Sequence, residues 1–153
     1  MTERPRLVYI LILLWLALSC IFVLWGSYSL LILVQIPSWE NFLDSSILPP
    51  LHFGYLMGTI VWFMFSILFV VFAYGTFKTK SWVWTAGLII TTIFLVVFGL
   101  MLTSLMITAM QFRDLFSVAG LTTTVLALLA DIGIVFCITR PVIKLYFGSN
   151  ATE

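Results

Sequence analysis

The stretch that decides the fold is residues 60–74, IVWFMFSILFVVFAY, in which Ser66 is the only residue that is neither apolar nor aromatic. Apolar side chains occupy every side of this segment, so it lacks the alternation of apolar and polar residues that a membrane-barrel strand shows. A helix that is apolar on all sides is typical of a membrane span. The segment therefore predicts a transmembrane helix.

The same pattern extends outward from this segment into four spans. A helix needs about 20 mainly apolar residues to cross a bilayer, and four stretches exceed that length: residues 7–34, 53–77, 82–110 and 115–139. We therefore expect an all-α fold, an integral membrane four-helix bundle built as two antiparallel transmembrane hairpins. The spans fill most of the chain, which predicts a single transmembrane domain over residues 1–153.

Composition excludes other classes of protein. Of the 153 residues, 63% are hydrophobic and only 8% are charged, whereas about a quarter of a soluble domain is charged. The formal net charge of +1 gives no basic face for nucleic acid, and disorder requires low hydrophobicity. We therefore expect the lipid bilayer to be the chain's main partner and expect no nucleic-acid binding.

Basic residues predict the orientation. Only Arg113 lies between the third and fourth spans, whereas the other six lie before the first span, between the second and third, or after the fourth: Arg4, Arg6, Lys78, Lys80, Arg140 and Lys144. Loops rich in Lys and Arg remain on the cytoplasmic side. This asymmetry predicts cytoplasmic N- and C-termini in a membrane of the cytoplasmic type.

The first outer loop, residues 35–52, has a helical pattern of its own. Apolar residues recur at helical spacing with polar residues between them: Trp39, Phe42, Leu43 and Ile47, and Glu40, Asn41 and Asp44. This pattern predicts a short amphipathic helix on the outer leaflet. It could serve as a folded cap, or Trp39, Glu40, Asp44 and His52 could form a docking surface for a partner subunit or an outer ligand.

That loop also holds the only combination of side chains that resembles a metal site. Glu40, Asp44 and His52 are possible ligands, but catalytic zinc and copper sites generally need three well-placed ligands that commonly include more than one His, and the chain has a single His. No Ser/His/Asp set or phosphate-binding glycine loop is evident. We therefore expect no metal, no cofactor and no enzymatic activity from this chain alone.

Asp131 is the only charged residue inside a predicted span. An ionisable group within a membrane is costly and is by default a candidate for function. Gly120, Thr124, Ala127 and Asp131 follow at positions i, i+4, i+7 and i+11, so they share one helix face of small and polar residues. We expect this face, with Asp131, to point into the bundle, where Gly120 and Ala127 allow close helix packing.

Two interpretations of Asp131 remain open. It carries a proton or binds a cation during transport, or it is a protonated polar clamp that bonds to a hydroxyl or a backbone carbonyl of a neighbouring helix. Suitable hydroxyls belong to Ser19, Thr91, Thr92 and Thr103. The clamp is favoured because a proton pathway normally needs a chain of ionisable groups, and the spans contain no second one.

Gly54 and Gly58 form a small-xxx-small pair at the start of the second span. Such pairs allow two helices to approach closely. We expect this pair to pack against another helix of the same chain, with association between chains as the alternative.

The fourth span and the tail carry a family resemblance. They contain LLADI at residues 128–132 and TRPVIKLYFG at residues 139–148, and an earlier turn at 75–82 contains a Lys-x-Lys pair before Trp82. This resembles small uncharacterised four-helix membrane proteins of prokaryotes with an Arg-Pro-x-x-Lys-x-Tyr-Phe-Gly tail. The resemblance implies a fold and a topology but no activity. Asp131 stands where that pattern tends to have Asn, which favours the hydrogen-bonding role.

These features together favour a non-catalytic accessory or structural subunit of a larger membrane complex, such as a respiratory or monooxygenase-type assembly. The chain has almost no mass outside the spans and no evident catalytic groups, so other membrane subunits are its expected partners. The alternative is a small oligomeric transporter or channel that uses Asp131.

Overall fold

The computed structural model describes residues 6–35, 50–111 and 118–148, and within these ranges the regular structure is entirely helical. The helices are α1 (Arg6–Gln35), α3 (Pro50–Phe77), α4 (Ser81–Gln111), α5 (Val118–Ile138) and α6 (Pro141–Gly148). Four of them, all but α6, are long and apolar enough to cross a membrane. The predicted all-α class with four apolar spans is confirmed. The predicted amphipathic helix in the first outer loop lies outside the described residues.

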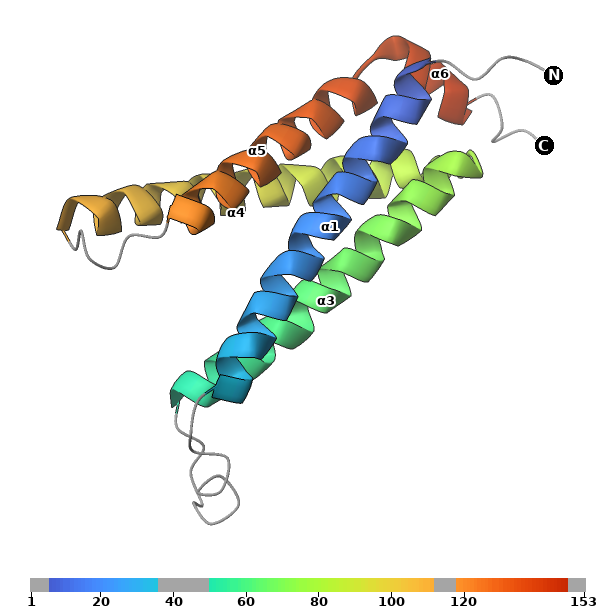
Figure 1. The fold of residues 1–153 in the computed structure, drawn as a ribbon. Coiled ribbons are helices and arrows are strands. Elements are labelled where there is room, and N and C mark those ends of the chain that lie inside the picture. The colour runs from blue at the N-terminus through green and yellow to red at the C-terminus, as the bar shows by residue number, and fades with distance from the viewer. Residues whose placement is uncertain (1–5, 36–49, 112–117, 149–153) are drawn as a thin grey trace.

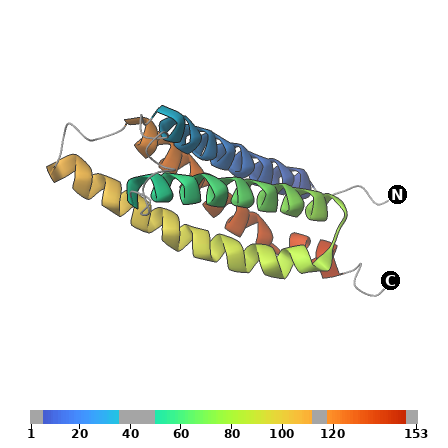
Figure 2. The ribbon, with the colours of Figure 1, turned by 90° about the horizontal axis from the view of Figure 1, so that it is seen from below.

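The four long helices form two pairs (Figure 1). Helix α1 packs along α3, and α4 packs along α5, while α1 also contacts α5. The pairs come together where α1 begins and where α6 lies, and they diverge toward their opposite ends, as Figure 1 shows. Figure 2, a view from below, shows the four helices running along a common direction in projection. We call the end where the pairs come together the closed end and the opposite end the open end. The halves of the bundle that contain these ends are the closed half and the open half.

Aromatic side chains hold the closed half together. Along α1, five fully buried residues are spaced three and four apart, which is the spacing of one helix face: Val8, Leu11, Trp15, Leu18 and Phe22. The ring of Phe22 lies 5.3 Å from that of Phe69 in α3 and 5.4 Å from that of Phe94 in α4. Ring pairs at such distances favour packing beyond the area that they bury. Phe22 therefore joins α1, α3 and α4.

The turn between α3 and α4 has a left-handed residue. Thr79 has a φ of 55°, and the amide of Lys80 donates to the carbonyl of Gly75 at 3.0 Å while that of Thr79 donates to the carbonyl of Thr76 at 3.2 Å. This pair of bonds is the Schellman arrangement, which usually places glycine at the left-handed position. A β-branched residue such as Thr79 is strained in the left-handed conformation, so the rest of the fold must stabilise this turn.

Helix α6 was not predicted. The sequence indicates that Arg140-Pro141 ends the fourth span, and α5 does end at Ile138. However, proline also suits the first position of a helix, because its fixed φ is already helical and its missing N–H would have no partner there. Pro141 therefore begins α6, which buries Ile143 and Phe147 against the closed end.

Burial differs between the two ends. In α4, the buried side chains include Val83, Thr91, Phe94 and Phe98, and no described side chain beyond Phe98 in this helix is buried. The core is therefore concentrated in the closed half.

Candidate functional site

The predicted polar face of α5 points into the bundle. Thr124, Ala127 and Asp131 are buried, with Asp131 at 0% exposure, while Gly120 is half-buried. The spacing i, i+4, i+7, i+11 places them on one side of the helix. This side faces α1 and α4, because α5 packs against both helices.

Asp131 makes no hydrogen bond to the described residues that would make it a clamp. Neither carboxyl oxygen has a partner among the described residues. The four candidate hydroxyls are engaged elsewhere: Ser19 with Ser66, Thr91 with the carbonyls of Gly87 and Leu88, Thr92 with that of Leu88, and Thr103 with that of Gly99. The bond predicted by the clamp interpretation is therefore not formed within the described chain.

The helix register places Asp131 level with Thr91. The indole nitrogen of Trp84 in α4 donates to the carbonyl of Ile138 in α5 at 3.1 Å. Asp131 lies seven residues before Ile138, and Thr91 lies seven after Trp84, so on helices that run in opposite directions both are displaced by the same rise. Asp131 is therefore deep in the closed half, beneath the layer in which Trp84 and Ile138 meet.

A second buried polar atom in this half has no partner among the described residues. The indole nitrogen of Trp15 in α1 makes no hydrogen bond to the described residues, and the Trp15 ring lies close to Gly87 in α4. A buried donor and a buried carboxyl acceptor thus both lie between α1, α4 and α5 in the closed half. Neither polar group makes a fixed hydrogen bond to the described residues, which is costly for buried groups.

Among the described residues, Gly54 and Gly58 do not pack closely against another helix of the chain. Of the residues that the structure describes, a Cβ on Gly54 would meet no atom within 4 Å, and one on Gly58 would meet only Trp62 of its own helix. Close helix approach occurs instead at Gly26, Gly87 and Gly133, where a Cβ would lie 3.1–3.2 Å from Phe63, Trp15 and Leu14 respectively. A small-xxx-small pair marks an interface only if the helix turns that face toward a neighbour.

A polar contact that joins α1 to α3 was not predicted from the sequence. The hydroxyls of Ser19 and Ser66 lie 2.9 Å apart, and Ser19 is also 3.1 Å from the carbonyl oxygen of Ser66. Both side chains are buried. The available signal was Ser66 itself, the one polar residue in the apolar stretch that decides the fold.

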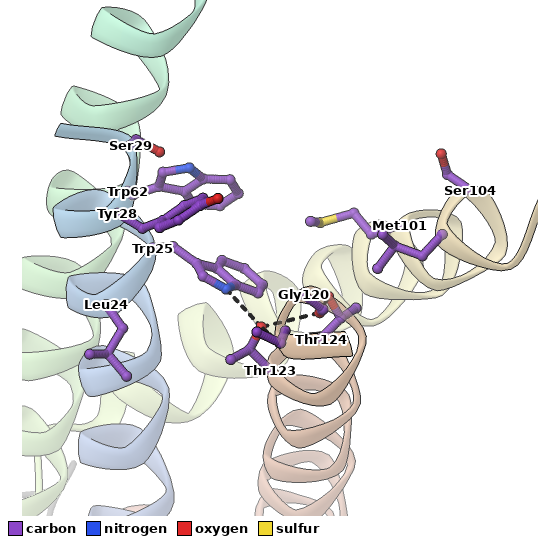
Figure 3. Close-up of a pocket in the computed structure, with 12 residues that line it drawn as sticks. Leu24, Trp25, Tyr28, Ser29, Trp62, Met101, Ser104, Gly120, Thr123 and Thr124 are labelled. Atoms are coloured by element: carbon purple, nitrogen blue, oxygen red, sulfur yellow. Dashed lines mark hydrogen bonds between the residues drawn. The ribbon is translucent and has the colours of Figure 1, made fainter. Parts of the chain in front are cut away.

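A pocket opens where the helix pairs diverge. It has a volume of about 550 Å³ and is lined from all four long helices. Figure 3 shows Trp25, Tyr28 and Trp62 on the side of α1 and α3, facing Met101 of α4 and Gly120 of α5. No sequence pattern predicted this pocket, since it depends on how the two pairs cross.

One hydrogen bond closes the base of the pocket. The indole nitrogen of Trp25 donates to the hydroxyl of Thr123 at 3.1 Å (Figure 3). The single hydrogen of that hydroxyl is shared between the carbonyls of Ala119 at 2.9 Å and Gly120 at 3.1 Å. Thr123 therefore uses its hydroxyl both as donor and as acceptor. This bond links α1 to α5 where the two pairs begin to separate.

The candidate outer-loop surface is not described. Trp39, Glu40 and Asp44 lie outside the described residues, as does the side chain of His52, whose backbone belongs to α3. In the described part of the chain, no group of three or more His, Cys, Asp or Glu side chains could hold a metal ion.

Comparisons of this chain with protein families, curated proteins and solved structures give no match. The resemblance to small prokaryotic four-helix membrane proteins therefore stays a prediction from the sequence.

Proposed function

We propose that the chain is a non-catalytic accessory or structural subunit of a larger membrane protein complex, in which its open half packs against partner subunits. A respiratory or monooxygenase-type assembly is the kind of complex that we favour. The observation that carries the proposal is the unpacked distal half of α4.

In this part of α4, no described side chain from residue 99 onward is buried, and large apolar residues are exposed on several sides of the helix, among them Leu100, Met106 and Ile107. Transmembrane helices associate through side-chain packing rather than through exclusion of water. The distal half of α4 makes little use of this packing within the chain, so it is the segment most suited to contact another subunit.

Photocrosslinking tests this proposal. A photoreactive phenylalanine analogue placed at Leu100 in α4, which is 67% exposed, should form an adduct with one discrete membrane protein. The matched control is the same analogue at Ile67 in α3, which is 64% exposed and lies in the well-packed pair. We expect no protein adduct from Ile67, because α3 already packs along α1.

Gentle detergent extraction provides the second measurement. The chain should be recovered with stoichiometric partner subunits. Recovery only as a free monomer or a homo-oligomer, together with adducts to lipid alone at Leu100, would contradict the accessory-subunit proposal.

The second candidate function is a small transporter or channel that uses Asp131. It is supported by the buried carboxyl group, neither oxygen of which bonds to the described residues. Reconstitution into liposomes separates the two candidates. Loss of a proton- or ion-dependent flux in Asp131→Asn would favour transport, whereas no flux in either protein would favour the accessory role.

The orientation is part of the same proposal. The five described basic residues begin α1, connect α3 to α4, or lie in and beside α6: Arg6, Lys78, Lys80, Arg140 and Lys144. All are exposed, and they lie toward the closed end. An excess of Lys and Arg at one end supports a cytoplasmic location for that end. Labelling Lys78→Cys with a membrane-impermeant thiol reagent tests this, since only opened cells should react.

A further inference from the structure

We propose that the pocket at the open end binds an uncharged membrane amphiphile whose head group is a planar ring bearing carbonyl oxygens, of the quinone type. This inference does not depend on the proposed function, because it concerns a site built within this chain.

The size and position of the pocket suit such a ligand. Its volume of about 550 Å³ falls within the range of about 300–1,000 Å³ that small-molecule sites occupy. Two lining residues, Leu24 and Tyr28, are strongly exposed, so the pocket reaches the surface between the diverging helix pairs. In a bilayer this surface is in contact with lipid, and a ligand dissolved in the membrane can enter from the side.

The charge of the lining selects a neutral head group. None of the twelve lining residues is Asp, Glu, Lys, Arg or His. A phosphate or an ammonium group in this pocket would be partly desolvated without a compensating charge, which is unfavourable. The lining therefore disfavours the head groups of phospholipids.

The shape of the lining selects a flat head group. Three aromatic side chains, Trp25, Tyr28 and Trp62, form the wall contributed by α1 and α3. The opposite wall has the small residues Ala119 and Gly120 with the flexible Met101. Aromatic faces favour offset or edge contacts with another ring, and a methionine sulfur packs well against a ring. A planar ring fits between these walls better than a branched head group.

The side of the pocket formed by α1 and α3 carries groups that can donate hydrogen bonds. Among the lining residues on this side, Tyr28 and Ser29 carry hydroxyls and Trp62 carries an indole nitrogen, and the structure assigns these atoms no hydrogen bond within its described ranges. An indole N–H only donates, and a hydroxyl can donate. Carbonyl oxygens are the matching acceptors, which completes the assignment of a ring that bears carbonyl groups.

Quenching of tryptophan fluorescence by decylubiquinone tests the proposal in protein reconstituted in nanodiscs. We expect saturable quenching at one site per chain. Ala119→Phe should fill the pocket and weaken binding by about tenfold or more. Ala17→Phe is the matched control, because Ala17 is exposed on α1 and does not line the pocket, and it should bind like the parent protein.

Trp62→Phe gives a second variant that preserves the aromatic wall and removes one donor. Loss of one hydrogen bond should weaken binding about three- to tenfold, with Trp25 remaining as the reporter. Trp82→Phe, at the closed end, should leave the affinity unchanged. If Ala119→Phe does not fold, as judged by gel filtration and circular dichroism, the comparison of Trp62→Phe with Trp82→Phe tests the proposal instead.

Three results would overturn the proposal. The first is quenching that does not saturate or that is equal in the variants and in their controls. The second is equally tight competition by decanol, which lacks the ring, and the third is equally tight competition by a short-chain phosphatidylcholine. Failure of the Leu100 crosslink would affect only the accessory-subunit proposal.

Discussion

The closed and open halves of this bundle are formed by the same four apolar helices, yet their side chains make different contacts. In the closed half, Trp15, Phe22, Phe69 and Phe94 are buried against one another across α1, α3 and α4. In the open half, the helix pairs diverge, α4 buries no described side chain beyond Phe98, and a pocket lies between the pairs.

The difference shows that hydropathy alone does not determine where a membrane bundle closes. Lipid covers apolar side chains as well as another helix does, so association depends on close packing and on a few polar contacts. Large rings with complementary shapes supply the packing in the closed half. In the open half the large rings of Trp25, Tyr28 and Trp62 all lie on the side of α1 and α3, and the residues facing them from α5 are small, which leaves surface for ligands and partners.

The largest expected effect comes from the centre of the closed half. Phe22→Ala should lower the free energy of unfolding by about 3–5 kcal/mol, because Phe22 is fully buried and its ring contacts rings from both α3 and α4. Leu100→Ala in the open half should change it by less than about 0.5 kcal/mol. Unfolding titrations with SDS measure both. Equal losses would remove the distinction between the halves.

Gly75, at the closed end, and Gly54, near the start of α3, allow the same comparison with a single added methyl group. A Cβ on Gly75 would collide with Val83 and approach the ring of Trp82, whereas one on Gly54 would meet no atom of the described residues. Gly75→Ala should therefore destabilise the protein by about 1–3 kcal/mol. Gly54→Ala should be neutral or stabilise it slightly, because alanine favours helix. A stable Gly75→Ala variant would show that the α3–α4 turn is looser than described.

Asp131 is the exception within the closed half. Because its oxygens have no partner among the described residues, Asp131→Val should raise the free energy of unfolding by about 1–3 kcal/mol, the penalty of an unsatisfied buried polar group. The same titrations measure this change. A loss of similar size would show that the carboxyl group is bonded as a clamp.

The smallest expected effect is at the base of the pocket. Thr123→Val removes the acceptor for the Trp25 indole and should cost about 0.6–1 kcal/mol. Thr122→Val is the matched control, since Thr122 is exposed and bonds only to the carbonyl of Val118 in its own helix. The control should leave stability unchanged. Equal effects of the two substitutions would mean that the Trp25–Thr123 bond does not link α1 to α5.

Much of the fold was predictable because the signal is one of composition. The apolar runs lie close to the helices, and the spacing of Thr124, Ala127 and Asp131 correctly placed them on one buried face. Each of these features depends on the residues of a single helix and on the helical repeat.

Features that depend on two helices were not predictable in the same way. The hydroxyls that were candidates to bond Asp131 are engaged elsewhere, and Gly54 faces no neighbouring helix among the described residues. The pocket arises from the crossing of the helix pairs, to which no local pattern corresponds. Helix α6 could have been found from Pro141, since proline is as suited to begin a helix as to end one.

The central claim is that the two helix pairs meet at the closed end and separate at the open end. Electron paramagnetic resonance distances between spin labels on α1 and α4 test it most directly, in a background with Cys20 and Cys137 replaced by alanine. One pair would use Leu31 and Ile107 toward the open end, and the other Tyr9 and Ile89 toward the closed end; all four side chains are exposed. The account predicts a clearly longer separation for Leu31–Ile107 than for Tyr9–Ile89. Equal separations, as in a bundle closed along its whole length, would contradict it.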